Sequence, residues 1–230
     1  MKKIFLYLFV LVSAGVLAAD AWGNDIVYLI CKPAIMITLG LHYLVTQRET
    51  KQPVSRPLLL AILFSCAGDT LLMFQGKDAN FFIYGLAAFL VAHIFYILTY
   101  RQHRTDDNAN ELQGLQKIRY AFPILLSGTG LVVILFNRLG GMKLPVLVYA
   151  AVLTFMVITA LFRFGRTNAT SFAMVFGGAI LFMISDSLIA IDKFLEPLPM
   201  AGIWIVTTYI VAQYLIVTGL SSHKTREALY

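Results

Sequence analysis

Charged residues are scarce in this chain of 230 residues, in which Asp, Glu, Lys and Arg together account for 13%. Soluble domains carry about 25% of these residues, so the composition excludes an ordinary water-soluble protein. Cysteine is also rare: Cys31 and Cys66 are the only two, and both fall within apolar runs, so the sequence supports no disulfide framework. The P-loop, the dinucleotide-binding fingerprint, the HExxH motif and the nucleophile elbow are absent, so none of these common sites is indicated.

Apolar residues are abundant instead, at 59% of the chain, and the mean hydropathy is +0.79. A helix needs about 20 mostly apolar residues to cross roughly 30 Å of bilayer hydrocarbon, and the sequence repeats that pattern between short polar breaks. The runs are continuously apolar and do not alternate, which excludes a membrane β-barrel. We therefore predict an all-α polytopic membrane protein, a single domain over residues 1–230, with a bundle of eight transmembrane helices at residues 4–22, 26–46, 57–75, 80–100, 120–137, 144–162, 170–191 and 199–220.

The first span begins like a secretory signal peptide, with Lys2 and Lys3 before an apolar stretch and a Val16-x-Ala18 sequence that resembles a signal-peptidase site. The apolar run continues to Trp22, which is longer than a signal peptide requires and ends on an aromatic residue suited to the membrane interface. We therefore predict that this segment is retained as the first transmembrane helix.

The distribution of basic residues predicts the orientation of the bundle. Lys and Arg concentrate in the segments that face the cytoplasm if the N-terminus is inside, as the positive-inside rule requires. These segments hold 13 of the 18 basic residues: Lys2, Lys3, Arg48, Lys51, Arg56, Arg101, Arg104, Lys117, Arg119, Arg163, Arg166, Lys224 and Arg226. We expect both termini in the cytoplasm and the protein in a bacterial inner (plasma) membrane. The net charge of +6 follows from this topology, so we predict membrane lipid as a partner and no nucleic acid.

Two sequence motifs recur in the same order. "GDTLLM" in the third span resembles "SDSLIA" in the seventh, and "LVAHIFY" in the fourth resembles "IVAQYLI" in the eighth. Such short matches also arise by chance between apolar helices. If they reflect a duplication, the two four-helix halves are parallel repeats, because an even number of helices preserves direction, and Asp69 and Asp186 occupy equivalent places.

Asp69 and Asp186 stand within otherwise apolar spans, where a carboxylate is costly. An Asp at the centre of a span costs roughly 2.5–3.5 kcal/mol on insertion, against a total folding stability of about 5–15 kcal/mol. Lys32 in the second span is predicted at a similar depth, in the outer half of the bilayer. One acid and one base would suffice for a buried ion pair that holds helices together. The second carboxyl favours another interpretation, a surplus proton-binding site that serves acid–base chemistry.

A second group of polar residues is predicted deeper in the bundle. His93 in the fourth span and Gln213 in the eighth lie about 20 Å from the outer ends of their helices, and Tyr209 shares the face of Gln213. We interpret Lys32, His93, Tyr209 and Gln213 as residues that bind substrate or support the aspartates, although a buried His is also common as a packing residue. A metal site is not expected, because zinc catalysis uses three protein ligands and the other histidines lie at span ends or outside the spans.

Five motifs, taken in order, resemble the YhhN family, which includes the TMEM86 lysoplasmalogenases. They are "CKP" in the second span, "AGDTLLM" in the third, "FLVAHIFY" in the fourth, "MISDSLIA" in the seventh and "YIVAQYL" in the eighth. The resemblance covers nearly the whole chain. It implies a lysophospholipid substrate, hydrolysis of the vinyl ether bond of lysoplasmalogens to a fatty aldehyde and a glycerophospho-base, and catalytic roles for Asp69 and Asp186.

Paired carboxyl groups suit this reaction. A vinyl ether is hydrolysed by protonation of its β-carbon, which creates an oxocarbenium ion that water attacks. One aspartic acid would supply the proton and the other would stabilise the cation and orient water, as in glycoside hydrolysis. Lys32 would keep one aspartate ionised or bind the lysolipid phosphate, and no cofactor is required. The alternative functions are a transporter or flippase of a small amphiphile, in which the carboxylates relay protons, and a non-catalytic scaffold.

Overall fold

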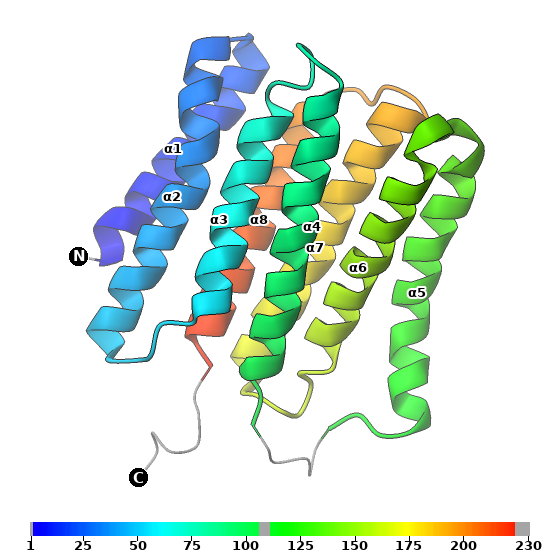
Figure 1. Cartoon of the computed structure of the whole chain (residues 1–230). Coiled ribbons are helices and arrows are strands. Elements are labelled where there is room, and N and C mark those ends of the chain that lie inside the picture. Colours follow the sequence, from blue (N-terminus) through cyan, green and yellow to red (C-terminus); the bar gives the residue numbers. More distant parts are fainter. Residues whose placement is uncertain (1, 106–110, 224–230) are drawn as a thin grey trace.

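The computed structural model describes residues 2–105 and 111–223, and within these ranges the protein consists of eight α-helices and two short 3₁₀ helices (Figure 1). The α-helices are α1 (Lys2–Trp22), α2 (Asp25–Thr50), α3 (Arg56–Leu72), α4 (Asn80–Gln102), α5 (Leu115–Leu135), α6 (Lys143–Leu161), α7 (Ala169–Phe194) and α8 (Ala201–Ser221). The 3₁₀ helices η1 (Phe136–Arg138) and η2 (Gly140–Met142) connect α5 to α6. The predicted all-α architecture is confirmed.

Seven of these helices are long and apolar enough to cross a membrane, as an integral membrane protein requires. Among the described helices α3 is the exception, because it has 17 residues and ends at Leu72 instead of the predicted residue 75. The chain forms turns at residues 73–77. A helix of 17 residues is about 25 Å long, which is at the lower limit for a span. α3 runs beside α2 and α4 within the bundle (Figure 1).

Other helix boundaries extend beyond the predicted spans. α2 continues to Thr50 and ends where Lys51 adopts a left-handed conformation, with φ 54°. α5 begins at Leu115, five residues before the predicted start at residue 120. Hydropathy marks the part of a helix that lies in hydrocarbon, whereas hydrogen bonding along the backbone continues into polar sequence outside it. The predicted ranges are therefore shorter than these helices.

The helix pairs with the most extensive contacts are α3 with α4, α7 with α8, and α1 with α2. Glycine permits two of these approaches. A Cβ atom at Gly68 of α3 would lie 2.6 Å from the ring of Phe89 on α4, and one at Gly178 of α7 would lie 2.8 Å from the carbonyl oxygen of Ala212 on α8. Small residues at such positions let transmembrane helices pack closely, which places their polar side chains within reach of one another.

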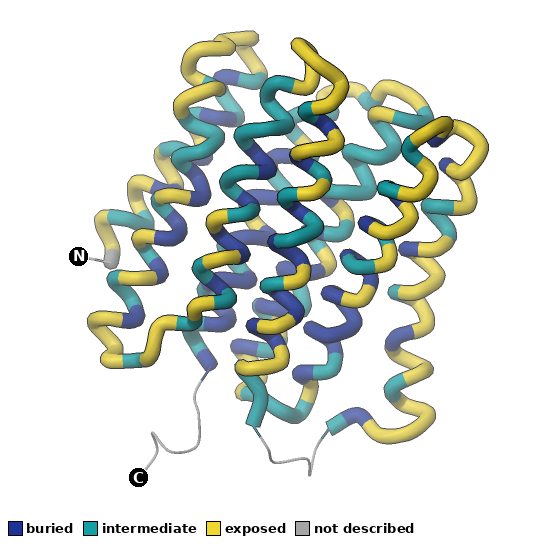
Figure 2. The backbone as a smooth tube through the Cα atoms, viewed as in Figure 1, coloured by how far each residue is buried: buried dark blue, intermediate teal, exposed yellow. Residues whose placement is uncertain are grey.

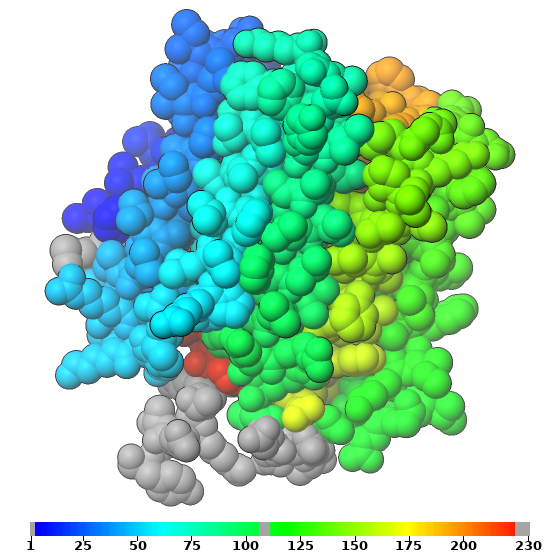
Figure 3. Space-filling view, in the orientation of Figure 1, coloured from blue at the N-terminus to red at the C-terminus, as the bar shows by residue number. Residues whose placement is uncertain are grey.

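The bundle has an edge-to-edge order. α1 and α2 lie at one edge and α5 at the other, with α3, α4, α6, α7 and α8 between them (Figure 1). Buried residues follow the inner helices, and of the seven spans α6 is the most buried and α5 the least (Figure 2). On the face seen in Figure 3, the side chains of neighbouring helices pack against one another. The α3–α4, α5–α6 and α7–α8 connections share one end of the bundle, which we call the upper end after its place in Figure 1.

The predicted duplication and the predicted membrane orientation stay predictions. Two of the basic residues on which the orientation depends, Lys224 and Arg226, lie outside the described residues.

Candidate functional site

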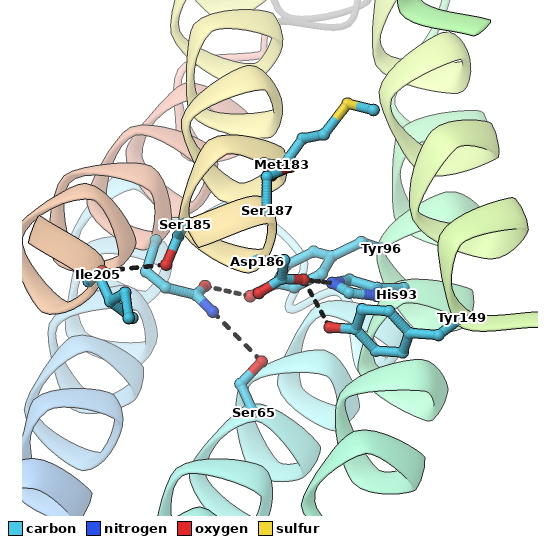
Figure 4. Close-up of polar contacts among 10 residues, drawn as sticks. Ser65, His93, Tyr96, Tyr149, Met183, Ser185, Asp186, Ser187 and Ile205 are labelled. Atoms are coloured by element: carbon cyan, nitrogen blue, oxygen red, sulfur yellow. Dashed lines mark hydrogen bonds and ion pairs between the residues drawn. The ribbon is translucent and has the colours of Figure 1, made fainter. Parts of the chain in front are cut away.

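Asp186 faces polar side chains from two other helices. This residue of α7 accepts a hydrogen bond from Tyr149 of α6, with 2.5 Å between the phenol oxygen and Oδ2. His93 of α4 faces the same carboxyl group, with its Nε2 3.8 Å from Oδ2 (Figure 4). The Asp186 side chain is 9% exposed and that of His93 is fully buried. Asp186 therefore points into the protein and not toward lipid.

Asp69 of α3 has a comparable partner on another helix. Tyr209 of α8 donates a hydrogen bond to its Oδ2 over 2.6 Å. Asp69 is 3% exposed and Tyr209 is 5% exposed, so both side chains are buried. A charged or polar group in such a position needs a hydrogen-bond partner, because none is available from lipid. The structure thus places Tyr209 at Asp69, whereas the sequence analysis only grouped it with Gln213.

The two carboxyl groups belong to one buried cluster of rings. Phe182 of α7 packs against Tyr209, with 5.5 Å between ring centroids, and against His93, with 4.8 Å. The charge of Asp69 acts on Asp186. Within residues 2–105 and 111–223, no side chain forms a hydrogen bond to both carboxyl groups. The charge of Asp69 is therefore close enough to influence Asp186, but the two carboxyl groups have no hydrogen-bond partner in common.

Lys32 forms no ion pair with Asp69 or Asp186, so the structure does not support the alternative of a buried ion pair that holds the helices together. Its ammonium group donates a hydrogen bond to the Tyr28 hydroxyl over 2.6 Å and lies 4.9 Å from the centroid of that ring. The side chain reaches a polar cavity of about 280 Å³ that Asp20 also lines. Long basic side chains in a membrane extend toward such polar regions, and this removes the ammonium group from the bundle centre. The charge of Lys32 still acts on Asp69.

Gln213 belongs to a polar layer below Asp69, but His93 is not part of it. Gln213 of α8 accepts a hydrogen bond from Tyr96 of α4 and donates one to Ser65 of α3 over 3.3 Å (Figure 4), so it links three helices. His93 lies beside Asp186 instead. Neither of its ring nitrogens has a hydrogen-bond partner among the described residues. His93 can therefore bind a polar group that enters next to Asp186.

Tyr149 is the member of this site that sequence patterns do not identify. It stands in the apolar stretch "LPVLVYAAVL", and it is 8% exposed. A buried tyrosine hydroxyl usually has a hydrogen-bond partner, so its position within a span is a signal of polar contact. The identity of the partner depends on how α6 packs against α7, which spacing along the chain does not specify.

Asp186 and Tyr149 border two small cavities of about 50 Å³ each. One extends toward the upper ends of α3, α4 and α7, and the other lies between α5, α6 and α7. Asp69 lines neither cavity. Asp186 is therefore the carboxyl group that a small bound group would meet. In the described parts of the chain, no cluster of three or more His, Cys, Asp or Glu side chains is arranged to hold a metal ion.

A separate polar cluster lies at the opposite end of the bundle, where a cavity of about 420 Å³ is lined by Arg56, His103 and His223, among others. The Nδ1 atom of His223 lies 2.7 Å from the hydroxyl of Thr167. Burial, together with the nearby charged groups His103 and Arg163, lowers the pKa of His223 to about 4. This histidine is therefore neutral at pH 7 in the folded protein.

Several curated proteins are similar to this chain over two thirds or more of its length. Lysoplasmalogenase TMEM86A of Bos taurus is 28% identical over 206 residues, which cover 86% of this chain and 75% of that protein. Lysoplasmalogenase TMEM86B of Homo sapiens is 32% identical over 156 residues, which cover 68% and 59%. A lysoplasmalogenase of Mycobacterium tuberculosis (strain CDC 1551 / Oshkosh) is 28% identical over 196 residues, which cover 82% and 69%. No solved structure matches the chain significantly. The sequence profile of the YhhN family matches residues 27–220, so this protein belongs to the YhhN family.

Proposed function

We propose that this protein is an intramembrane hydrolase that cleaves the vinyl ether bond of lysoplasmalogens and releases a fatty aldehyde and a glycerophospho-base. The observation that supports this most directly is a buried carboxyl group, Asp186, that borders apolar cavities and lies within electrostatic range of a second carboxyl group, Asp69. The similar proteins that are named lysoplasmalogenases agree with the proposal.

Asp186 is the proton donor in this proposal. It borders both cavities, and a buried carboxyl group without a neighbouring cation is less costly when protonated. The Tyr149 hydroxyl occupies Oδ2, which leaves Oδ1 to carry the proton. Asp69 is assigned the carboxylate role, because the positive charge of Lys32 acts on it and Tyr209 donates a hydrogen bond to it.

The reaction then needs one water molecule and no cofactor. Asp186 transfers its proton to the β-carbon of the vinyl ether, whose π electrons form the new C–H bond, and the α-carbon and oxygen become an oxocarbenium ion. The negative charge of Asp69 stabilises this cation. Water adds to the α-carbon and returns a proton to Asp186. The hemiacetal then breaks its bond to the glycerol oxygen, which takes up the hydroxyl proton, and the aldehyde leaves. His93 faces Asp186 and orients the water.

We also propose that the protein lies in a bacterial inner membrane with both termini in the cytoplasm, as its basic residues suggest. The upper end of the bundle then faces outward, and the cavities that Asp186 borders lie closer to the outer surface than to the cytoplasm.

The test uses the full chain, purified in detergent and incubated with 1-alkenyl and 1-acyl lysophospholipids, with released aldehyde and fatty acid measured by mass spectrometry. We expect aldehyde from the alkenyl substrate in the absence of any ion gradient. Asp186→Asn lowers kcat by about 10²- to 10⁴-fold, the usual contribution of a positioned proton donor. Asp192→Asn is the matched control on the same helix, because Asp192 accepts a hydrogen bond from the Leu198 backbone that Asn also accepts.

Two outcomes would contradict the proposal. A folded Asp186→Asn variant with wild-type turnover would exclude the acid–base role. Binding of alkenyl lysolipid by the wild-type protein without release of aldehyde would favour a transporter.

A further inference from the structure

A groove between α5 and α6 provides space for an aliphatic chain. Its volume is about 430 Å³, within the range of small-molecule binding sites. Apart from two threonines its lining residues are apolar or glycine, and none is charged. α5 is the outermost helix on this side of the bundle and the least buried span (Figure 1). The groove is therefore open to the acyl chains of the bilayer.

The groove adjoins one of the cavities at Asp186, and the two share part of their lining. Gly128 and Val132 of α5, together with Ala150 and Thr154 of α6, line both the groove and the cavity between α5, α6 and α7. Asp186 and Tyr149 lie at the far side of that cavity. An apolar wall thus runs from the lipid-facing side of the protein to the proposed proton donor.

The other cavity at Asp186 extends to a cation at the upper end. Phe82 and Phe194 line this cavity and pack edge to face, with 5.9 Å between ring centroids. The Lys193 ammonium group lies 4.4 Å from the centroid of the Phe82 ring and donates a hydrogen bond to the side chain of Gln75 over 3.1 Å. Two contacts therefore hold the Lys193 side chain beside the wall of the cavity.

The spacing between Lys193 and Asp186 matches a lysophospholipid. Lys193 follows Asp186 by seven residues on α7, which places it on the same helix face and about 10 Å closer to the upper end. In a lysoplasmalogen, the three-carbon glycerol separates the vinyl ether oxygen from the phosphate. A lysine side chain at this distance can reach a phosphate while the vinyl ether lies at Asp186, and an ammonium group is a common phosphate ligand.

We propose that the substrate binds with its alkenyl chain in the α5–α6 groove, its vinyl ether at Asp186 and its phosphate at Lys193. This inference rests on the proposed function and adds the direction in which the lipid enters and the residue that selects a phosphorylated head group. It leaves Lys32 to act on Asp69 and not on the phosphate.

The head-group part is tested with Lys193→Gln on two substrates, an alkenyl-glycerophosphoethanolamine and the corresponding alkenylglycerol, which lacks the phosphate. We expect KM for the phospholipid to rise by about tenfold and KM for the alkenylglycerol to stay unchanged. Lys77→Gln is the matched control, because Lys77 also lies over a phenylalanine ring at the upper end, with Nζ 5.1 Å from the Phe74 centroid, but Phe74 does not line the cavity. Equal effects of Lys193→Gln on both substrates, or no effect on either, would overturn this assignment.

The chain part is tested with Ala150→Phe, which fills the junction of groove and cavity. We expect kcat/KM to fall by more than about tenfold for a hexadecenyl substrate and to change little for a short, butenyl substrate. Val148→Phe is the control on the same helix, because Val148 is 42% exposed and lines neither space. An unchanged chain-length profile in Ala150→Phe would overturn the groove assignment. If the wild-type protein releases no aldehyde from any of these substrates, the proposed function fails, whereas failure of either variant test leaves that function intact.

Discussion

The hydrogen bond between Tyr149 and Asp186 allows a quantitative prediction for Tyr149→Phe. When Asp186 gives up its proton, a negative charge develops on a buried carboxyl group, and the Tyr149 hydroxyl, 2.5 Å from Oδ2, is the donor that stabilises it. The next polar atom known to face that oxygen is His93 Nε2 at 3.8 Å, too far for a hydrogen bond. A hydrogen bond to a charged group contributes about 1.5–3 kcal/mol. Its loss in the transition state therefore lowers kcat by about 10- to 150-fold.

The assay is aldehyde release from an alkenyl lysophospholipid under saturating substrate, with KM determined in parallel. We expect KM to change little, because the bond strengthens as charge develops and not when substrate binds. Tyr100→Phe is the matched control: Tyr100 is fully buried on α4, and its hydroxyl has no hydrogen-bond partner among the described residues. A Tyr149→Phe protein with an unchanged unfolding temperature and a kcat within about threefold of wild type would refute the reasoning, since no proton donor would then depend on this hydroxyl.

Three further predictions concern other parts of the bundle. Gly68→Ala forces the Phe89 ring to move and lowers the free energy of unfolding by about 1–3 kcal/mol, as measured by thermal unfolding. Gly177→Ala is the control and leaves stability unchanged, because a Cβ there meets no atom within 4 Å. Equal effects of the two substitutions would exclude close α3–α4 packing as the cause. The stability of the protein falls as pH drops from about 6.5 toward 4, because His223 is neutral in the folded protein and gains a proton more readily when the chain is unfolded. His223→Gln weakens this pH dependence, and a variant whose stability follows the same pH profile as wild type would contradict the prediction. Lys32→Gln lowers kcat several-fold without raising KM, because it removes the positive charge near the Asp69 carboxylate. A rise in KM alone would instead indicate that Lys32 binds the phosphate.

The sequence predicts the helical fold and three of the buried polar residues of the site for a simple energetic reason. Asp69, Asp186 and His93 stand out because each is costly in hydrocarbon, and all three lie in the buried interior. That cost depends only on residue type and on position within a span. It therefore remains visible in the sequence of any membrane protein whose spans are clear.

Side-chain direction and helix packing are what the sequence does not specify. The predicted depth of Lys32 allows an ion pair with an aspartate, but its flexible side chain extends along α2 to a polar cavity. Tyr149 was not identified, because its partner is on α7 and the contact depends on the packing of two helices. His93 lies beside Asp186 and not below it. The two residues are on helices of unequal length, the 23-residue α4 and the 26-residue α7, so depth counted from a helix end is unreliable.

The position of α5 separates the choice of lipid from the acid–base chemistry, so that one can change without the other. α5 packs almost entirely on α6 and carries none of the side chains that contact Asp69 or Asp186. Substitutions along its inner face can therefore alter which lipids are accepted while the acid–base apparatus stays as it is. Homologues with different lipid preferences are accordingly expected to differ most in this helix, and directed evolution toward new ether lipids has a natural place to begin.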